Sequence, residues 1–150
     1  MYYAVDIYKK NKNYIIIPST KDETGIGSVP LNKPIIKDEL NLNEILTLVK
    51  QCLQYAYATP QIKSSEIIDV LSKITGIDNQ IKLCEEWQTV SVIENTNNEE
   101  KYYTLTALHP NGKGARIGFK PVILLPKNVS SNDFGNAVLK LFKMIYEYKS

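Results

Sequence analysis

The stretch Gly25-Ile26-Gly27, followed by Lys33-Pro34-Ile35-Ile36 and a run of apolar residues to Tyr57, decides our interpretation of the fold because it returns near the C-terminus. Gly112-Lys113-Gly114 repeats the glycine pair, and Lys120-Pro121-Val122-Ile123 repeats the Lys-Pro pair with its two apolar residues. The same spacing along the chain separates both pairs of landmarks. Two independent features with one shift indicate an internal duplication.

Apolar residues at helical spacing follow each Lys-Pro pair, at an offset two residues larger. They are Ile45, Leu48, Val49, Cys52, Leu53, Ala56 and Tyr57 in the first copy, and Phe134, Ala137, Val138, Leu141, Phe142, Ile145 and Tyr146 in the second. We therefore predict repeat units at about residues 1–58 and 86–148, with a helical insert at about 61–85. The alternative is chance similarity between two amphipathic helices.

Each predicted unit begins with a β-hairpin. Residues 3–8 and 14–18 form the first, which Pro18 should end, and residues 87–94 and 102–108 form the second. Residues 14–17 are apolar at successive positions, so both faces of that strand should be covered. In the insert, Ser64 or Ser65 can cap a helix that ends at Gly76.

These elements predict an α+β fold in a single domain of residues 1–150. We expect a mostly antiparallel sheet built from two repeated hairpin, loop, strand and helix units, with the helices packed on one side. A groove between the two units would be the natural recess for a partner.

Composition limits the classes of partner. The net charge of +2 and the isoelectric point near 8.4 are too mild to indicate a nucleic-acid or membrane partner. We see no signal peptide and no apolar run of membrane-spanning length, so we expect a cytoplasmic protein. Cys52 and Cys84 lie in separate segments without a CxxC motif, and we expect both to be reduced.

Residues with catalytic chemistry are few. His109 is the only histidine and is predicted to lie in a turn before Pro110, where a solvated histidine is more common than a catalytic one. Gly112-Lys113-Gly114 matches neither a dinucleotide-binding nor a P-loop pattern. Glu99-Glu100 would need further carboxylates from elsewhere to hold a metal. We therefore expect no enzyme activity, no cofactor and no metal.

A partner-binding surface is the remaining interpretation of the polar loops. Tyrosines gather on the two predicted hairpins, where sheet packing is the plain explanation and a contact surface the functional one. Acidic pairs lie in two predicted loops. The candidate partner-binding residues are Asp22, Glu23, Glu99, Glu100, Tyr102 and Tyr103.

The stretch from Tyr14 to Gly27, with Pro18-Ser19 and Gly25-Ile26-Gly27, the strand at Pro34-Ile35-Ile36, and Gly135-Asn136-Ala137-Val138-Leu139 in the last helix carry a resemblance to a known family. The chain resembles CdiI-type immunity proteins of bacterial contact-dependent growth inhibition systems. The resemblance implies a cytoplasmic, non-enzymatic protein that binds the C-terminal toxin domain of its cognate CdiA, commonly a nuclease, and blocks its activity.

The net charge of the chain differs from what a nuclease partner would lead us to expect. An inhibitor of a basic nuclease is usually acidic, whereas this chain is slightly basic. Either the acidic residues that meet the partner are gathered locally, at Asp22-Glu23 and Glu99-Glu100, or the partner is not strongly basic.

The alternative functions are a small enzyme or toxin acting through His109, Tyr103 and Lys113, and a general protein-binding module.

Overall fold

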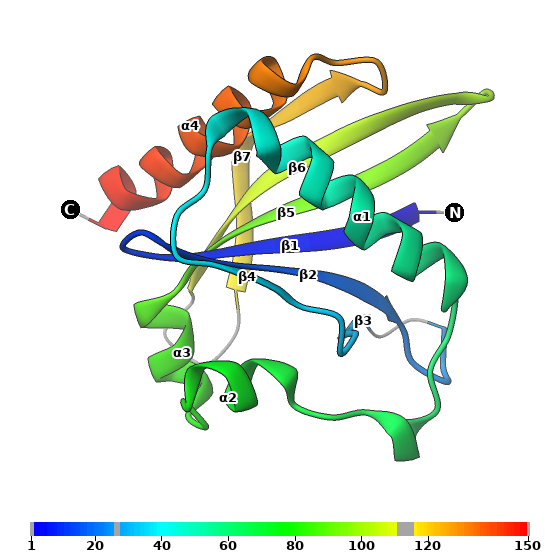
Figure 1. The fold of residues 1–150 in the computed structure, drawn as a ribbon, viewed down its shortest axis with the longest axis vertical. Coiled ribbons are helices and arrows are strands. Elements are labelled where there is room, and N and C mark those ends of the chain that lie inside the picture. The colour runs from blue at the N-terminus through cyan, green and yellow to red at the C-terminus, as the bar shows by residue number, and fades with distance from the viewer. Residues whose placement is uncertain (1, 26–27, 111–115, 150) are drawn as a thin grey trace.

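The computed structural model describes residues 2–25, 28–110 and 116–149. Within them, seven strands form one sheet in the order β3-β2-β1-β5-β6-β7, and β4 also pairs with β2 (Figure 1). All of these strand pairs are antiparallel. The prediction of an α+β fold with a mostly antiparallel sheet is confirmed.

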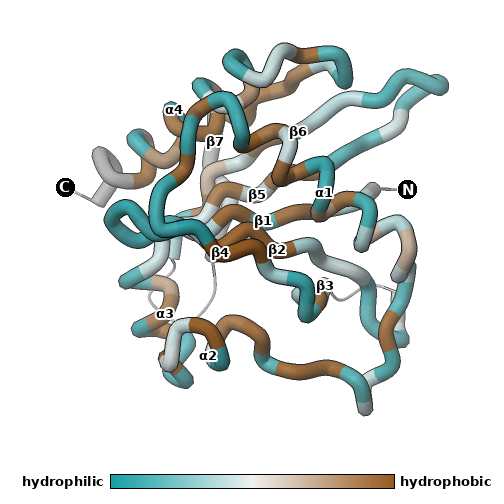
Figure 2. The backbone as a smooth tube through the Cα atoms, viewed as in Figure 1, coloured by the Kyte–Doolittle hydropathy of each residue, from teal (hydrophilic) through white to brown (hydrophobic). Residues whose placement is uncertain are grey.

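Two hairpins supply the centre of the sheet, as the alternating sequence pattern predicts. The first joins β1 (Tyr2–Lys10) to β2 (Asn13–Lys21), and the second joins β5 (Gln88–Asn97) to β6 (Glu100–Pro110). Strands β1 and β5 pair with each other in the middle of the sheet. Figure 2 shows that hydrophobic residues concentrate on these central strands.

Pro18 does not end β2, contrary to our prediction. Its carbonyl oxygen accepts a hydrogen bond from the backbone N–H of Leu31 at 2.8 Å, on the side away from β1. The nitrogen of a strand residue points to the same side as its carbonyl, so the donor that proline lacks is missing there and not in the β1–β2 ladder. The strand therefore continues to Lys21.

Three further strands complete the sheet. They are β3 (Ser28–Pro30), β4 (Ile35–Lys37) and β7 (Arg116–Pro126). Strand β3 pairs with the last residues of β2. Strand β7 pairs with β6 and ends at Pro126. A register shift opposite Thr106 bends the β6–β7 pair around Pro121.

The helices after the two hairpins cover one face of the sheet. The 3₁₀ turn η1 (Leu42–Glu44) leads into α1 (Ile45–Ala58), and α4 (Ser131–Lys149) ends the chain. Asn41 and Glu44 form a capping box, and the Ser130 hydroxyl accepts the backbone N–H of Asp133 at 3.1 Å. Both predicted apolar stripes lie in one core cluster with Val5, Ile7, Val90 and Val92. The side chain of Tyr146 lies outside the described residues.

The insert packs on the opposite face, which corrects our expectation that all helices lie on one side. It forms η2 (Ser64–Glu66), α2 (Val70–Thr75) and α3 (Gln80–Glu86). These helices cover Tyr8, Ile15 and Ile17, so both faces of β2 are buried as predicted. The N-cap of α2 is Asp69 rather than Ser64 or Ser65, whereas Gly76 ends the helix in the expected left-handed conformation.

The two predicted units share an order of elements, but the sequence offset fails at one strand. The first hairpin is followed by two outer strands and a helix, the second by one outer strand and a helix, and both helices share one face. The offset equates Ile35 with Val122, yet Ile35 packs on the core while Val122 is 43% exposed and Ile123 packs inward. A one-residue slip reverses the face of a strand residue, so the Lys-Pro pairs are not equivalent. The glycine pairs fall partly or wholly outside the described residues, and the duplication stays a prediction.

Candidate partner-binding site

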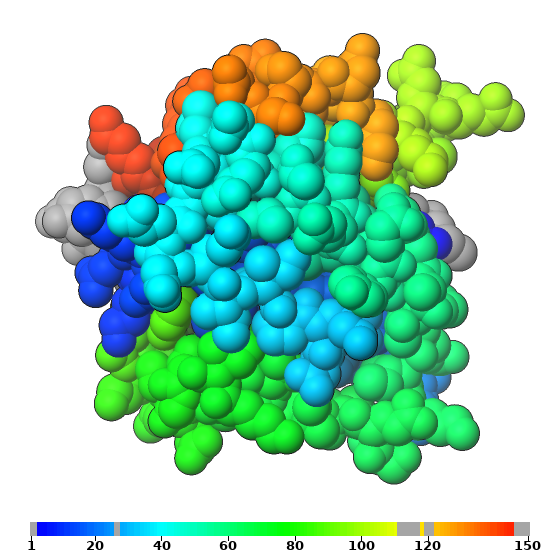
Figure 3. Space-filling model, viewed as in Figure 1, coloured from blue at the N-terminus to red at the C-terminus, as the bar shows by residue number. Residues whose placement is uncertain are grey.

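The β5–β6 hairpin extends beyond its neighbours at one end of the sheet. Tyr2, at the start of β1, pairs with Asn95, and Pro126, at the end of β7, pairs with Tyr102. Residues 96–101 therefore pass the ends of both flanking strands, and every one of them is exposed. Figures 1 and 3 show the tip projecting from the body of the molecule. We call residues 96–101 the hairpin tip.

The turn in the hairpin tip places an acidic residue where the backbone favours glycine. Asn98 and Glu99 are the two central residues of the turn, with φ values of 50° and 69°. Two left-handed residues in a row fit the tight turn that matches strand twist, and Asn-Gly is its preferred sequence. In the part of the chain that the structure describes, the carboxylates of Glu99 and Glu100 form no ion pair.

An open recess of about 620 Å³ lies against the hairpin tip. The β5–β6 hairpin supplies mostly polar residues to its wall, and β7 supplies apolar ones. Residues that line it include Asn97, Glu100, Lys101, Tyr102, Leu124 and Pro126. Leu124 is 63% exposed and Val122, two residues earlier on the same side of β7, is 43% exposed. The recess therefore combines an apolar strip with a charged rim.

The apolar strip is exposed because of how β7 is packed. Alternate residues of a strand face opposite sides of the sheet, and Ile123 and Leu125 pack into the core beneath α1 and α4. Val122 and Leu124 face the other side. The helices on that side pack mainly on Tyr8, Ile15 and Ile17 of β1 and β2; α3 also contacts β6, but no residue of β7 belongs to their apolar cluster. Val122 and Leu124, which we call the apolar strip, therefore belong to neither hydrophobic cluster of the described residues.

A buried polar cluster lies behind the recess, on the face that α1 and α4 cover. Glu94 is 3% exposed, and its carboxylate accepts hydrogen bonds from the Tyr57 hydroxyl and the Lys127 ammonium group. The Lys127 nitrogen also lies 4.8 Å from the centre of the Tyr103 ring, and Tyr3 meets Tyr57 edge-on with ring centres 4.6 Å apart. Lys127 directly follows β7, so the cluster ties the end of that strand to α1 and β5.

The pKa values of Tyr57 and Lys127 are both raised in the folded protein. Burial raises the pKa of Tyr57, and the hydrogen bond to Glu94 and the charge of Glu94 raise it further. Burial lowers the pKa of Lys127, but its interactions with Glu94 and Tyr103 outweigh this effect, so the pKa is raised overall. Both groups therefore keep their protons at neutral pH. The charge on Lys127 and the Tyr57 donor are then both present to stabilise the Glu94 carboxylate.

The structure divides the six predicted site residues into three groups. Glu99 and Glu100 lie in the exposed hairpin tip, and the half-buried Tyr102 lines the recess. Asp22 and Glu23 follow β2 at the same end of the sheet, because β2 ends beside the start of β1 and the β5–β6 tip lies beyond that start. Tyr103, by contrast, does not lie on the surface. Tyr103 is fully buried and packs edge-on against Phe134 with ring centres 5.3 Å apart.

Asp22 and Glu23 maintain the loop that follows α1. An Asp22 carboxylate oxygen accepts the backbone N–H of Thr24 at 2.9 Å, and a Glu23 carboxylate oxygen accepts that of Ser64 at 2.8 Å. The Gln61 amide donates to the backbone carbonyls of both acids at 2.9 Å. These contacts give the two carboxylates a structural role.

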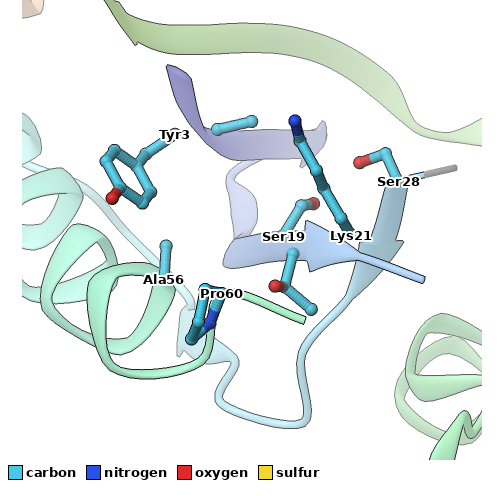
Figure 4. A pocket seen from close by; sticks show the side chains of 8 residues that line it. Tyr3, Ser19, Lys21, Ser28, Ala56 and Pro60 are labelled. Carbon is cyan, nitrogen blue, oxygen red and sulfur yellow. The ribbon is translucent and has the colours of Figure 1, made fainter. Parts of the chain in front are cut away.

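A smaller pocket of about 90 Å³ lies where α1 meets the ends of β1 and β2 (Figure 4). Tyr3, Ser19, Lys21, Ala56 and Pro60 contribute to its lining. The hydroxyl of Thr20, which also lines it, donates to the carbonyl oxygen of Thr59. The recess we predicted between the two units is not where these pockets lie, because α1 and α4 pack against each other.

The residues of the alternative enzymatic interpretation do not lie at this site. His109 belongs to β6 rather than to a turn, and it pairs with Ile117 at the end of the strand opposite to the hairpin tip. Lys113 lies outside the described residues. Among the described residues, no group of three or more His, Cys, Asp or Glu side chains is placed to hold a metal ion. Cys52 and Cys84 are both buried and free, as expected.

Comparison with known proteins supports the fold along nearly the whole chain. No family model matches, and no curated protein matches. A protein of unknown function from Neisseria meningitidis has a TM-score of 0.66 at 15% identity, covering 96% of this chain and 95% of its own. A chain of a CdiA-CT/CdiI toxin and immunity complex from Yersinia pseudotuberculosis has a TM-score of 0.65 at 8% identity, covering 95% and 97%. At these identities the likeness concerns the fold.

Glu94, Lys127 and Leu124 were not predicted as site residues from the sequence. Glu94 continues the alternation of Val90 and Val92, so its position on a buried face is visible in the sequence. Lys127 and Tyr57 carry no such signal, because they reach Glu94 only through the tertiary fold.

Among the described residues, every helix is too short or too polar to cross a membrane.

Proposed function

We propose that this chain is an immunity protein that binds the C-terminal toxin domain of a cognate CdiA effector and neutralises it in the cytoplasm. The observation that carries the proposal is the fold likeness to a chain of a toxin and immunity complex over 95% of this chain. The sequence resemblance at the Pro18-Ser19 stretch and at Gly135-Asn136-Ala137-Val138-Leu139 points to the same family.

The surface of the molecule favours binding as the mode of action. The hairpin tip and the strip of Val122 and Leu124 offer exposed carboxylates and exposed apolar side chains at one place. Protein interfaces gain affinity from apolar anchors and gain association rate from complementary charge. An immunity protein with these features neutralises a toxin by covering its functional surface.

The toxin domain we propose is a nuclease. A nuclease cleft must hold a polyanionic backbone and is therefore rich in lysine and arginine. The carboxylates of Glu99 and Glu100, which form no ion pair within the described chain, provide the opposite charge locally, although the whole chain has a net charge of +2. Because these two carboxylates lie together at the hairpin tip, they can attract a basic partner although the chain as a whole is slightly basic.

The test is protection from the toxin domain encoded by the reading frame immediately upstream of this gene. We expect co-expression to protect cells and the two purified proteins to form a stable complex. A toxin domain of unrelated sequence, with the same expression level, is the control and should still kill. Growth arrest caused by this chain alone would instead support the alternative that it is itself a toxin.

A second experiment separates binding from catalysis. His109 lies at the far end of β6 from the hairpin tip, so His109→Ala should leave the contact surface intact. We expect the variant to protect as well as the wild type. A folded His109→Ala protein that binds the toxin without protecting cells would show that neutralisation requires chemistry at this residue.

A further inference from the structure

We propose that the toxin docks in the recess between the hairpin tip and β7, with an apolar side chain against Leu124 and a neighbouring basic residue against Glu99 and Glu100. This inference rests on the proposed function and specifies the surface and the chemistry of the partner segment. Three independent features of the described residues support it.

The first feature is the apolar strip itself. Among the described residues, Leu124 is the most exposed of the large hydrophobic side chains, at 63%, and Val122 lies beside it on the same face of β7. Their strand neighbours Ile123 and Leu125 already supply the core beneath the helices. Because most of its surface stays in water, Leu124 contributes little to folding, whereas it provides an apolar anchor site for a partner.

The second feature is the charge at the rim. Glu100 and Lys101 line the recess, and Glu99 is next to them in the tip, which gives the rim two carboxylates against one ammonium group. In the described chain, none of the three ion pairs uses Glu99 or Glu100. A basic residue beside the apolar anchor would therefore find an exposed carboxylate with which to pair.

The third feature is the support behind the recess. Lys127 follows β7 directly, and its ammonium group is bound to the buried carboxylate of Glu94 on the opposite face of the sheet. Tyr57 of α1 binds the same carboxylate. The end of β7, which carries Leu124, is thereby attached to α1 and β5 before a partner arrives. A surface held in place in this way loses less conformational entropy on binding.

The experiment measures binding of the upstream-encoded toxin domain, in a catalytically inactivated form, to two matched variants. Leu124→Thr removes the apolar side chain and keeps a residue that strands tolerate. Ile36→Thr makes a similar change at a 57% exposed residue of β4, which belongs to the other half of the sheet. We expect Leu124→Thr to raise Kd about tenfold or more, as the loss of an interface anchor does, and Ile36→Thr to leave Kd unchanged.

The rim is tested with Glu100→Gln, which keeps the size of the side chain. We expect slower association, with a larger effect at low salt than at high salt, because salt screens exposed charges. Unchanged Kd in a folded Leu124→Thr protein, or an equal loss in Ile36→Thr, would overturn the inference. If the wild type fails to bind this toxin domain at all, the proposed function itself fails.

The sedimentation behaviour of the protein without toxin tests a different occupant of the recess. We expect a monomer for both the wild type and Leu124→Thr. A wild-type dimer that Leu124→Thr converts to a monomer would show that a second copy of this chain covers the strip, and would overturn the inference.

Discussion

The buried carboxylate of Glu94 accepts a hydrogen bond from the ammonium group of Lys127, although 33 residues separate them in sequence. Glu94 belongs to β5, and Lys127 follows the last strand of the sheet. Tyr57 adds a donor from α1 to the same carboxylate. A single charge thus holds together three elements at the end of the sheet that carries the hairpin tip.

Removing Lys127 should destabilise the fold. Lys127→Met keeps much of the side-chain stem but leaves Glu94, which is 3% exposed, with an uncompensated charge. Because the Lys127 side chain is itself 36% exposed, water can reach part of the site, and we expect a loss of about 1 to 3 kcal/mol in the free energy of unfolding. Urea denaturation measures this loss.

The partly exposed ion pair between Lys10 and Glu86 provides the control for Lys127→Met, because neither of its side chains is as buried as Glu94. Its side chains are 37% and 32% exposed, and the nitrogen and oxygen lie 2.9 Å apart. Solvent screens such a pair, so Lys10→Met should change stability much less. Equal effects of the two substitutions would mean that burial of Glu94 adds nothing to the strength of its ion pair.

Alkaline pH should weaken the same cluster. The folded state raises the pKa of Tyr57 above its ordinary value near 10, mainly by burial and then through Glu94, so the unfolded chain loses this proton first. The stability that Tyr57 contributes is therefore fully present below about pH 10 and is lost as pH rises above it. The raised pKa of Lys127 acts in the same direction.

Tyr57→Phe isolates this effect. The variant should be less stable than the wild type at about pH 7, since it loses the hydrogen bond to Glu94, and the difference should shrink as pH rises beyond about 10. Urea denaturation at a series of pH values gives both curves. A difference that stays constant up to about pH 11 would show that Tyr57 titrates alike in the folded and unfolded states.

The two amphipathic helices should contribute similarly to the core. Leu53 is fully buried and Phe142 is 2% exposed, and both belong to one hydrophobic cluster. Leu53→Ala or Phe142→Ala should each lower the free energy of unfolding by about 2 to 5 kcal/mol through lost burial and the cavity left behind. Exposed Gln54→Ala, on the outer side of α1, is the control. A variant that melts like the wild type would not support this role in the core.

Periodicity predicted both hairpins and both long helices because each buries one face. It indicated that both faces of β2 are covered, since Ile15, Ile16 and Ile17 are consecutive, but not which helices cover them. The insert helices turned out to pack on Ile15 and Ile17. An amphipathic pattern shows that a helix has a buried side, whereas the face on which it packs depends on how the chain returns to the sheet.

The candidate site was predictable only in part. Glu99 and Glu100 are both exposed at the hairpin tip, where the sequence predicted a solvent-exposed loop, although Glu100 already belongs to β6. The burial of Tyr103 was predictable, because Tyr103 alternates with the buried Leu105 and Ala107 while Tyr102 falls on the other face. The exposure of Leu124 was not predictable, because an apolar run such as residues 122–125 does not reveal that only one face of the strand receives a helix.

We expect Glu99 to lower the free energy of unfolding and to speed association with the toxin domain. It occupies a left-handed turn position with φ of 69°, where glycine is the preferred residue. Relieving a side chain from that conformation is worth about 1 to 2 kcal/mol. We therefore expect Glu99→Gly to raise the free energy of unfolding by about 1 kcal/mol and also to slow association with the toxin domain, because the carboxylate is lost.

Glu99→Gln separates the two effects, since it removes the charge and retains the backbone strain. Both variants should associate more slowly than the wild type, by more at low salt than at high salt, while only the glycine variant should be more stable. Stopped-flow association and urea denaturation of the three proteins provide the comparison. If Glu99→Gly is stabilised but associates at the wild-type rate, the carboxylate of Glu99 takes no part in recognition and the turn residue is merely suboptimal.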